Sequence, residues 1–188
     1  MDPNVQYSTQ QSPSSINQVG RMKGILYAEA IGSILWPTVV SRPDTAFAVG
    51  VLSQFMQNPS QAHWNAVKRV ISYLDTTKDL WLTFGGNKNS ILEGYCDADW
   101  ASQPHRHSIS GFSFHFGVGA VSWSSKKQSI VTLSSTEAEY IAETHAAKEG
   151  IWLRGFIKEI TGIDRDPLTL KADNQGAIAL AKDNKFHS

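Results

Sequence analysis

Apolar residues recur at intervals of three and four over residues 24–86, which is the spacing of one face of an α-helix. Three stretches carry the pattern: "YAEAIGSILW" from Tyr27, "DTAFAVGVLSQFM" after Pro43, and "SQAHWNAVKRVISYL", where Ser60 is placed to cap a helix. Pro37 interrupts the first stretch and lacks a backbone donor, which predicts a kink or break there. The pattern predicts a small helical segment.

The apolar spacing changes to two after residue 90, as in strands with one buried face. Short alternating runs broken by Gly and Ser, "ILEGYCDA", "SGFSFHFG" and "GAVSWSS", predict an antiparallel meander. A long helical pattern follows, "SSTEAEYIAETHAAKEGIWLRGFIKEI", and then a strand "DPLTLKA" and a helix "NQGAIALAK". The order βββαβα predicts an α/β fold with helices packed on a mixed sheet over residues 90–188.

Composition separates a leader from these two parts. Residues 1–23 are rich in Ser, Gln, Asn and Pro without apolar periodicity, which predicts an extended or disordered segment. The 188 residues include 17 basic and 17 acidic side chains, so any polyanion must be bound by a local group of residues. One cysteine, Cys96, excludes an internal disulfide and a Cys-rich zinc site. The sequence has no signal peptide or membrane-length apolar run, so we expect an intracellular protein without a membrane partner.

Acidic residues gather where the predicted strands end. Asp97 ends the first strand, with Asp99 two residues later in "YCDADW", and Asp173 ends the later strand just before a helix. Open α/β sheets bind ligands at the carboxyl ends of their strands. The start of the long helix adds Glu137 and Glu139, so acids from three elements can converge.

Helical periodicity alone does not choose between the two glutamates. Ser134 and Glu137 have the spacing of a capping box, which gives Glu137 a structural role. Glu139 shares its face with small residues such as Ala142, which permit close approach to the sheet. Thr136 and Glu139 have the same box spacing, so the choice stays open, and we favour Glu139 as the inward acid.

A cluster of carboxylates predicts a bound cation, because like charges repel and are costly to bury unpaired. Carboxylate oxygens are hard ligands that suit Mg²⁺ or Mn²⁺. A single Asp at a strand end is more often a turn or cap residue. The metal interpretation therefore depends on the acids lying together.

Several stretches resemble copia-type retrotransposon polyproteins. "GYCDADW", "GAVSWSSKKQSIVTLSSTEAEYIAETHAAKEGIWLR" and "KADNQGAIALAKDNKFHS" resemble their ribonuclease H region. "YAEAIGSILWPTVVSRPDTAFAVGVLSQFMQNPSQAHWNAVKRVISYL" is similar to the helical connection, or thumb-like segment, that joins the reverse transcriptase to that region. The resemblance implies a ribonuclease-H-like fold whose final strand and helix, with a fourth acidic ligand, are missing here. Cleavage by this chain alone is then expected to be weak or absent.

The resemblance also implies an activity. It places the three acids of the family on Asp97, Glu139 and Asp173, in the order Asp, Glu, Asp. These would hold two Mg²⁺ or Mn²⁺ ions and hydrolyse the RNA strand of RNA–DNA hybrids during reverse transcription, beside the reverse transcriptase of the parent polyprotein. The expected setting is a cytoplasmic virus-like particle or the nucleus. A catalytically silent remnant that folds or binds without cleaving is the alternative.

Further residues are candidates for contact with the hybrid, whose minor groove and 2′-hydroxyls would be recognised. They are Asn174, Gln175, Lys126, Lys127 and Arg106. Each also has a simpler interpretation: Asn174 and Gln175 begin a helix and can cap it, and basic side chains in loops are often only solvated.

Overall fold

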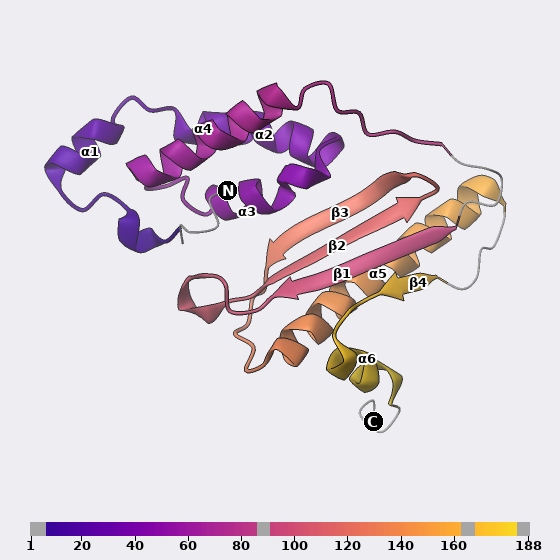
Figure 1. Cartoon of the computed structure of the whole chain (residues 1–188). Helices are drawn as coiled ribbons and strands as arrows, with labels where there is room; N and C mark the ends of the chain where they lie inside the picture. The colour runs from indigo at the N-terminus through magenta and orange to yellow at the C-terminus, as the bar shows by residue number, and fades with distance from the viewer. Residues whose placement is uncertain (1–6, 86–90, 163–167, 184–188) are drawn as a thin grey trace. The chain divides into compact units, whose positions relative to one another are not determined.

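The computed structural model describes residues 7–85, 91–162 and 168–183 (Figure 1). The chain divides into two compact units, Met1–Leu82 (unit 1) and Thr83–Ser188 (unit 2). The first six and last five residues of the chain, and the first two of the predicted strand "DPLTLKA", lie outside the described residues.

The segment expected to be an extended or disordered leader contains two short helices in its described part. A 3-10 turn, η1, spans Thr9–Gln11, and α1 spans Ile16–Met22. Ser15 Oγ accepts a hydrogen bond from the Gln18 backbone N–H (3.3 Å), and Gln18 Oε1 accepts one from the Ser15 N–H (3.4 Å). These polar caps stabilise α1 locally. The helix has no buried apolar face, so apolar periodicity could not predict it.

Unit 1 contains the three predicted helices. They are α2 (Tyr27–Val40), α3 (Ala46–Ser53), which follows the short η2 (Pro43–Thr45), and α4 (Gln61–Thr76). Ser60 caps α4 as predicted, with its Oγ accepting from the His63 N–H (3.2 Å). The buried core of this unit includes Tyr27, Ile31, Ile34, Val49, Leu52, Phe55, His63 and Val67.

Of the predicted kink or break at Pro37, the break does not occur, because α2 continues through Pro37 to Val40. Proline removes the hydrogen bond to the carbonyl four residues earlier, that of Ser33. Ser33 is exposed, so water can hydrogen-bond to this carbonyl. On the buried side, Thr38 Oγ1 donates to the Ile34 carbonyl (2.7 Å) and contacts Thr45 Oγ1 (2.8 Å).

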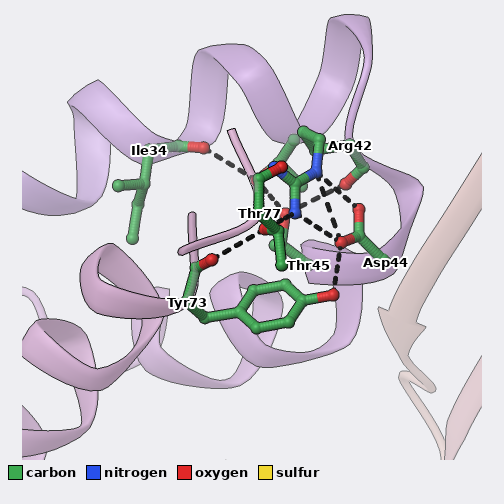
Figure 2. Close-up of polar contacts among 7 residues, drawn as sticks. Ile34, Arg42, Asp44, Thr45, Tyr73 and Thr77 are labelled. Carbon is green, nitrogen blue, oxygen red and sulfur yellow. Dashed lines mark hydrogen bonds and ion pairs between the residues drawn. The ribbon is translucent and has the colours of Figure 1, made fainter. Parts of the chain in front are cut away.

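Both residues of an ion pair in the turn after α2 form hydrogen bonds with the end of α4 (Figure 2). Arg42 Nη2 lies 2.7 Å from Asp44 Oδ2 and also donates to Thr77 Oγ1 (2.6 Å). Tyr73 on α4 donates its hydroxyl to Asp44 Oδ2 (2.8 Å). These contacts lower the pKa of Asp44, the hydrogen bond from Arg42 being the largest cause. The Asp44 charge is therefore compensated within the chain.

Unit 2 is a mixed sheet with two helices, in the predicted order βββαβα. Its strands are β1 (Leu92–Asp99), β2 (Ile109–Phe116), β3 (Gly119–Lys127) and β4 (Thr169–Lys171). Their spatial order is β3-β2-β1-β4, with the first three antiparallel and β4 parallel to β1. A short η3 (Pro104–Arg106) lies between β1 and β2. The helices are α5 (Ser135–Thr161) and α6 (Gln175–Lys182).

The long helix α5 packs on one face of the sheet (Figure 1). The fully buried Phe114 of β2 lies against two glycines, Gly94 of β1 and Gly150 of α5. A Cβ at residue 94 would collide with the Phe114 ring, and one at residue 150 would lie 2.5 Å from Leu168 Cδ2. The two glycines thus set how closely helix and sheet approach. Among the described helices, α5 included, none has the length and apolar character needed to span a membrane.

Candidate metal centre

The strand register brings Asp97 and Asp173 to the same level of the sheet. In the parallel pair β1–β4, Tyr95 lies opposite Lys171, so two residues further along Asp97 and Asp173 are at matching heights. β4 stops at Lys171, and the chain carries Asp173 past the last paired position. The prediction that Asp97 ends its strand is wrong by two residues, since antiparallel pairing with β2 extends β1 to Asp99.

Glu139 enters the site from the beginning of α5. Ser134 caps this helix, its Oγ accepting from the Glu137 N–H (3.1 Å). Ala138 and Ala142 beside it are fully buried, and their small side chains let the helix lie close to the sheet. Glu139 is only 7% exposed, which is rare for an unpaired glutamate.

The three acids lie together. One carboxylate oxygen from each of Asp97, Glu139 and Asp173 falls within 4.8 Å of the others. Glu139 is buried, and the two aspartates are exposed. The group is therefore open on the side of the strand ends and closed on the side of the helix.

The electrostatic environment of Glu139 disfavours its charge. Burial, followed by the negative charge of Asp97, raises the pKa of Glu139 to about 7, and Asp173 and Glu143 act in the same direction. A hydrogen bond from the Ala98 backbone acts in the opposite direction. Oε2 of Glu139 is buried without a hydrogen-bond partner, and so is Oε1 of Glu143, whose pKa burial also raises. Unpaired buried carboxylate oxygens of this kind lack a compensating positive group.

A divalent cation fits this donor set. Asp97, Glu139 and Asp173 offer hard oxygen ligands at a spacing that one or two ions can share. The nearby Cys96 stays a neutral thiol, because burial and the surrounding carboxylates raise its pKa to about 12, and its Sγ donates to the Lys171 carbonyl (3.7 Å). Without a thiolate, the group favours Mg²⁺ or Mn²⁺ over softer metals.

Glu137 is used elsewhere. Its Oε2 accepts a hydrogen bond from the Leu133 N–H (2.7 Å), so the side chain holds the turn before α5. This is the structural role that the capping spacing predicted, although the donor is one residue earlier than in a standard capping box. Glu139 is the glutamate that joins the aspartates.

The residues expected to contact a nucleic acid lie in several places around the group. Asn174 caps α6, its Oδ1 accepting from the Ala177 N–H (3.0 Å), which is the simpler of its two predicted roles. Gln175 begins that helix and is exposed. Arg106 lies over the Trp100 ring, its Cζ 5.8 Å from the ring centroid. The two lysines of "KKQ" end β3, where Lys126 is exposed and Lys127 half-buried.

Sequence reasoning missed two residues near the acids, Gln128 and Glu143. Gln128 is 2% exposed and contacts both β2 and α5. Glu143 follows Glu139 by one helical turn, a spacing that would have placed it on the same face. Nothing local in the sequence marks Gln128, since its contacts come from distant segments.

Comparison with known proteins relates the chain to transposons. It is 43% identical over 182 residues to the retrovirus-related Pol polyprotein from transposon TNT 1-94 of Nicotiana tabacum, covering 96% of this chain and 14% of that protein. It is 37% identical over 163 residues to the corresponding polyprotein from transposon RE2 of Arabidopsis thaliana, covering 86% of this chain and 11% of that one. No protein-family model and no solved structure matches.

A shorter relative is covered almost completely. The chain is 50% identical over 133 residues to secreted RxLR effector protein 161 of Plasmopara viticola. The aligned region covers 70% of this chain and 94% of that protein. The chain thus belongs to a family that unites retrovirus-related Pol polyproteins of transposons with shorter homologues. The chain spans about a seventh (14%) of the length of the tobacco polyprotein.

Proposed function

We propose that unit 2 is a ribonuclease-H-like domain that hydrolyses the RNA strand of RNA–DNA hybrids with Mg²⁺ or Mn²⁺. The observation that carries the proposal is the group of Asp97, Glu139 and Asp173, held within 4.8 Å at the strand ends of a βββαβα unit. The kinship with transposon Pol polyproteins supports it, because such elements copy RNA into DNA and pass through a hybrid. The upstream reverse transcriptase of a parent polyprotein is the proposed partner, in a virus-like particle or the nucleus.

The three acids have distinct tasks in this proposal. Asp97, Glu139 and Asp173 would hold the ions, and bound ions of this kind activate water and stabilise the leaving oxygen of a phosphodiester. Glu139 closes the buried side of the site, so the hybrid approaches over the exposed aspartates. Arg106 lies over the ring of Trp100, the residue after the end of β1, and its exposed guanidinium can neutralise a backbone phosphate.

The outer part of the substrate site is assigned on exposure and charge. Lys126 and Lys127 end β3 two strands away from Asp97 and offer further cations for the backbone. Gln175 is exposed two residues after Asp173 and can donate to a 2′-hydroxyl. Asn174 is already used as a helix cap, so its part is to hold Asp173 in place at the start of α6.

A second candidate function is binding without cleavage. The Plasmopara relative favours it, because a protein that this chain covers over 94% of its length is named a secreted effector rather than an enzyme. In this alternative the fold and the acids persist while hydrolysis is absent. Hybrid binding without product would then be the only activity.

A cleavage assay on an RNA–DNA hybrid in Mg²⁺ and in Mn²⁺ tests the proposal. Glu139→Gln should reduce cleavage by at least about 100-fold, since it removes a metal ligand. The matched control, Glu137→Gln, lies two residues away and should retain activity within about threefold, because its carboxylate only caps the helix. The assay is run on the chain alone and on a chain extended through the final strand and helix that the resemblance implies. Equal losses in both variants, or hybrid binding without cleavage by the extended chain, would overturn the enzymatic proposal.

A further inference from the structure

Gln128 lies between β2, which pairs with the strand of Asp97, and α5, which carries Glu139. Its side-chain Nε2 donates to Ser110 Oγ on β2 (2.8 Å) and to the Ala138 carbonyl on α5 (2.9 Å). Ala138 directly precedes Glu139 in the helix. One amide group thus joins the sheet to the helical turn that carries the buried acid.

These contacts form a closed path around the buried acid. Ser110 of β2 is the register partner of Ala98 in β1, the residue after Asp97. The Glu139 carboxylate accepts a hydrogen bond from the backbone of Ala98. The path therefore runs from Gln128 through Ser110 and Ala98 to Glu139 and returns along the helix to Gln128. Removing the Gln128 amide would break its contacts with both Ser110 and Ala138, the residue before Glu139.

The main chain of Gln128 is fixed independently. Its N–H donates to the Ser108 carbonyl (2.8 Å), and its carbonyl accepts from His107 Nδ1 (3.0 Å). Ser108 Oγ in turn contacts Thr132 Oγ1 (3.1 Å). The side chain therefore projects from a backbone held on both sides, which makes it a rigid link rather than an adaptable one.

The Gln128 side-chain oxygen indicates which property of the glutamine matters at this position. Oε1 of Gln128 is buried without a hydrogen-bond partner. An apolar side chain of similar length, such as methionine, would avoid burying that oxygen. The two N–H donors are then the property that the site uses.

We propose that Gln128 is a positioning residue that holds Glu139 against Asp97 and thereby sets the geometry of the carboxylate group. The cation arm of this inference rests on the proposed function. The geometric arm does not, because it concerns the distance between two acids in the absence of any ion.

A double-mutant cycle on the full chain in EDTA tests the geometric arm, with hydrogen exchange of the β1 and α5 amides reporting unit 2 alone. Asp97→Asn relieves repulsion with Glu139 and should slow exchange by about three- to tenfold. In a Gln128→Met background the same substitution should have less than half of that effect on a logarithmic scale. Equal factors in both backgrounds would mean that Gln128 stabilises the fold without positioning the acids, and would overturn the inference.

Two further variants keep the test decisive. Ser110→Ala removes one end of the link and serves in the cycle if Gln128→Met does not fold. Ser122→Ala is the matched control, because Ser122 also joins β3 to α5, donating to Glu149 Oε1 (2.7 Å) far from the acids. Its effect should add to that of Asp97→Asn. Coupling as large for Ser122 as for Ser110 would also contradict the proposal.

Titration with Mn²⁺, followed by the same exchange protection, tests the cation arm. Gln128→Met should raise the half-saturating Mn²⁺ concentration by about 10-fold or more, as expected when the support of a metal ligand is lost. Ser122→Ala should change it by less than about twofold. An unsubstituted chain without any response to Mn²⁺ would overturn the metal proposal, while the cycle in EDTA would still decide the role of Gln128.

Discussion

Asp44 in unit 1 and Glu139 in unit 2 are both carboxylates with a shifted pKa, and the chain treats their charges in opposite ways. Asp44 receives hydrogen bonds from Arg42 and Tyr73, and its pKa is lowered (Figure 2). Glu139 lies beside other acids, has an unpartnered Oε2, and its pKa is raised to about 7. A compensated charge holds a fold together, whereas an uncompensated one needs a partner from outside the chain.

The largest expected effect is on the stability of unit 1, where the charge of Asp44 is compensated. Arg42→Met should lower the free energy of unfolding of unit 1 by about 3 kcal/mol, because it removes the charged hydrogen bonds from the largely buried Arg42 side chain to both Asp44 and Thr77. Hydrogen exchange of the α2 and α4 amides would measure it. Lys78→Met is the matched control, since the Lys78–Asp75 pair is long (3.8 Å) and exposed, and should cost less than about 0.5 kcal/mol. A similar loss in both variants would remove the contrast.

A divalent cation should stabilise unit 2 by compensating the charge of its carboxylate group. At a Mn²⁺ concentration about 100 times the dissociation constant, unit 2 should gain about 2.7 kcal/mol while unit 1 gains nothing. Exchange protection read separately for α5 and for α4 gives both values in one experiment. Asp97→Asn should abolish most of the gain. Equal protection of the two units would indicate non-specific binding.

The two carboxylates should also respond oppositely to pH in EDTA. The Glu139 pKa is raised, so its stabilising contribution is complete below about pH 4.5 and lost as the pH rises towards about 7, a change of about 3 kcal/mol in unit 2. The Asp44 pKa is lowered, so its contribution is present at neutral pH and lost only as the pH falls below 3.8. Urea unfolding at each pH would measure both. Glu139→Gln should flatten the first dependence, and an unchanged profile would contradict the assignment.

The smallest expected effect concerns a locally compensated acid in unit 2. Glu137→Gln should lower the stability of that unit by about 0.5–1 kcal/mol, because a neutral amide is a weaker acceptor for the Leu133 N–H. Thermal unfolding with and without Mn²⁺ would measure it. The loss should be the same in both conditions. A loss that depends on Mn²⁺ would assign Glu137 to the metal group.

Local patterns predicted the elements of unit 2 well because its strands and helices have distinct periods. The alternation over β1 and the apolar arc of α5 are set by neighbouring residues, so both could be recognised without the fold. The convergence of Asp97, Glu139 and Asp173 followed from the rule that ligands gather at strand ends, and the register of β4 gives the physical reason. Their catalytic role stays a prediction.

The sequence misled where polar contacts outweigh periodicity. α1 forms on serine–glutamine caps with no apolar face, and Pro37 sits within α2 because the lost hydrogen bond faces solvent. Gln128 depends on residues from three other segments, a kind of contact that no window of sequence contains. Long-range polar links of this kind require coordinates.

The glycines around Phe114 affect how mutated copies of this gene should be interpreted. Gly150 lies 11 positions beyond Glu139 on α5, about 16 Å along the helix axis. A missense change in either glycine codon introduces a side chain that the packing around Phe114 cannot accept, so we expect α5 to shift and Glu139 to leave its aspartates. Gene copies altered at Gly94 or Gly150 would therefore lack the assembled carboxylate group while their sequences still display all three acids. A genome survey that counts only the acids would overestimate the number of intact copies.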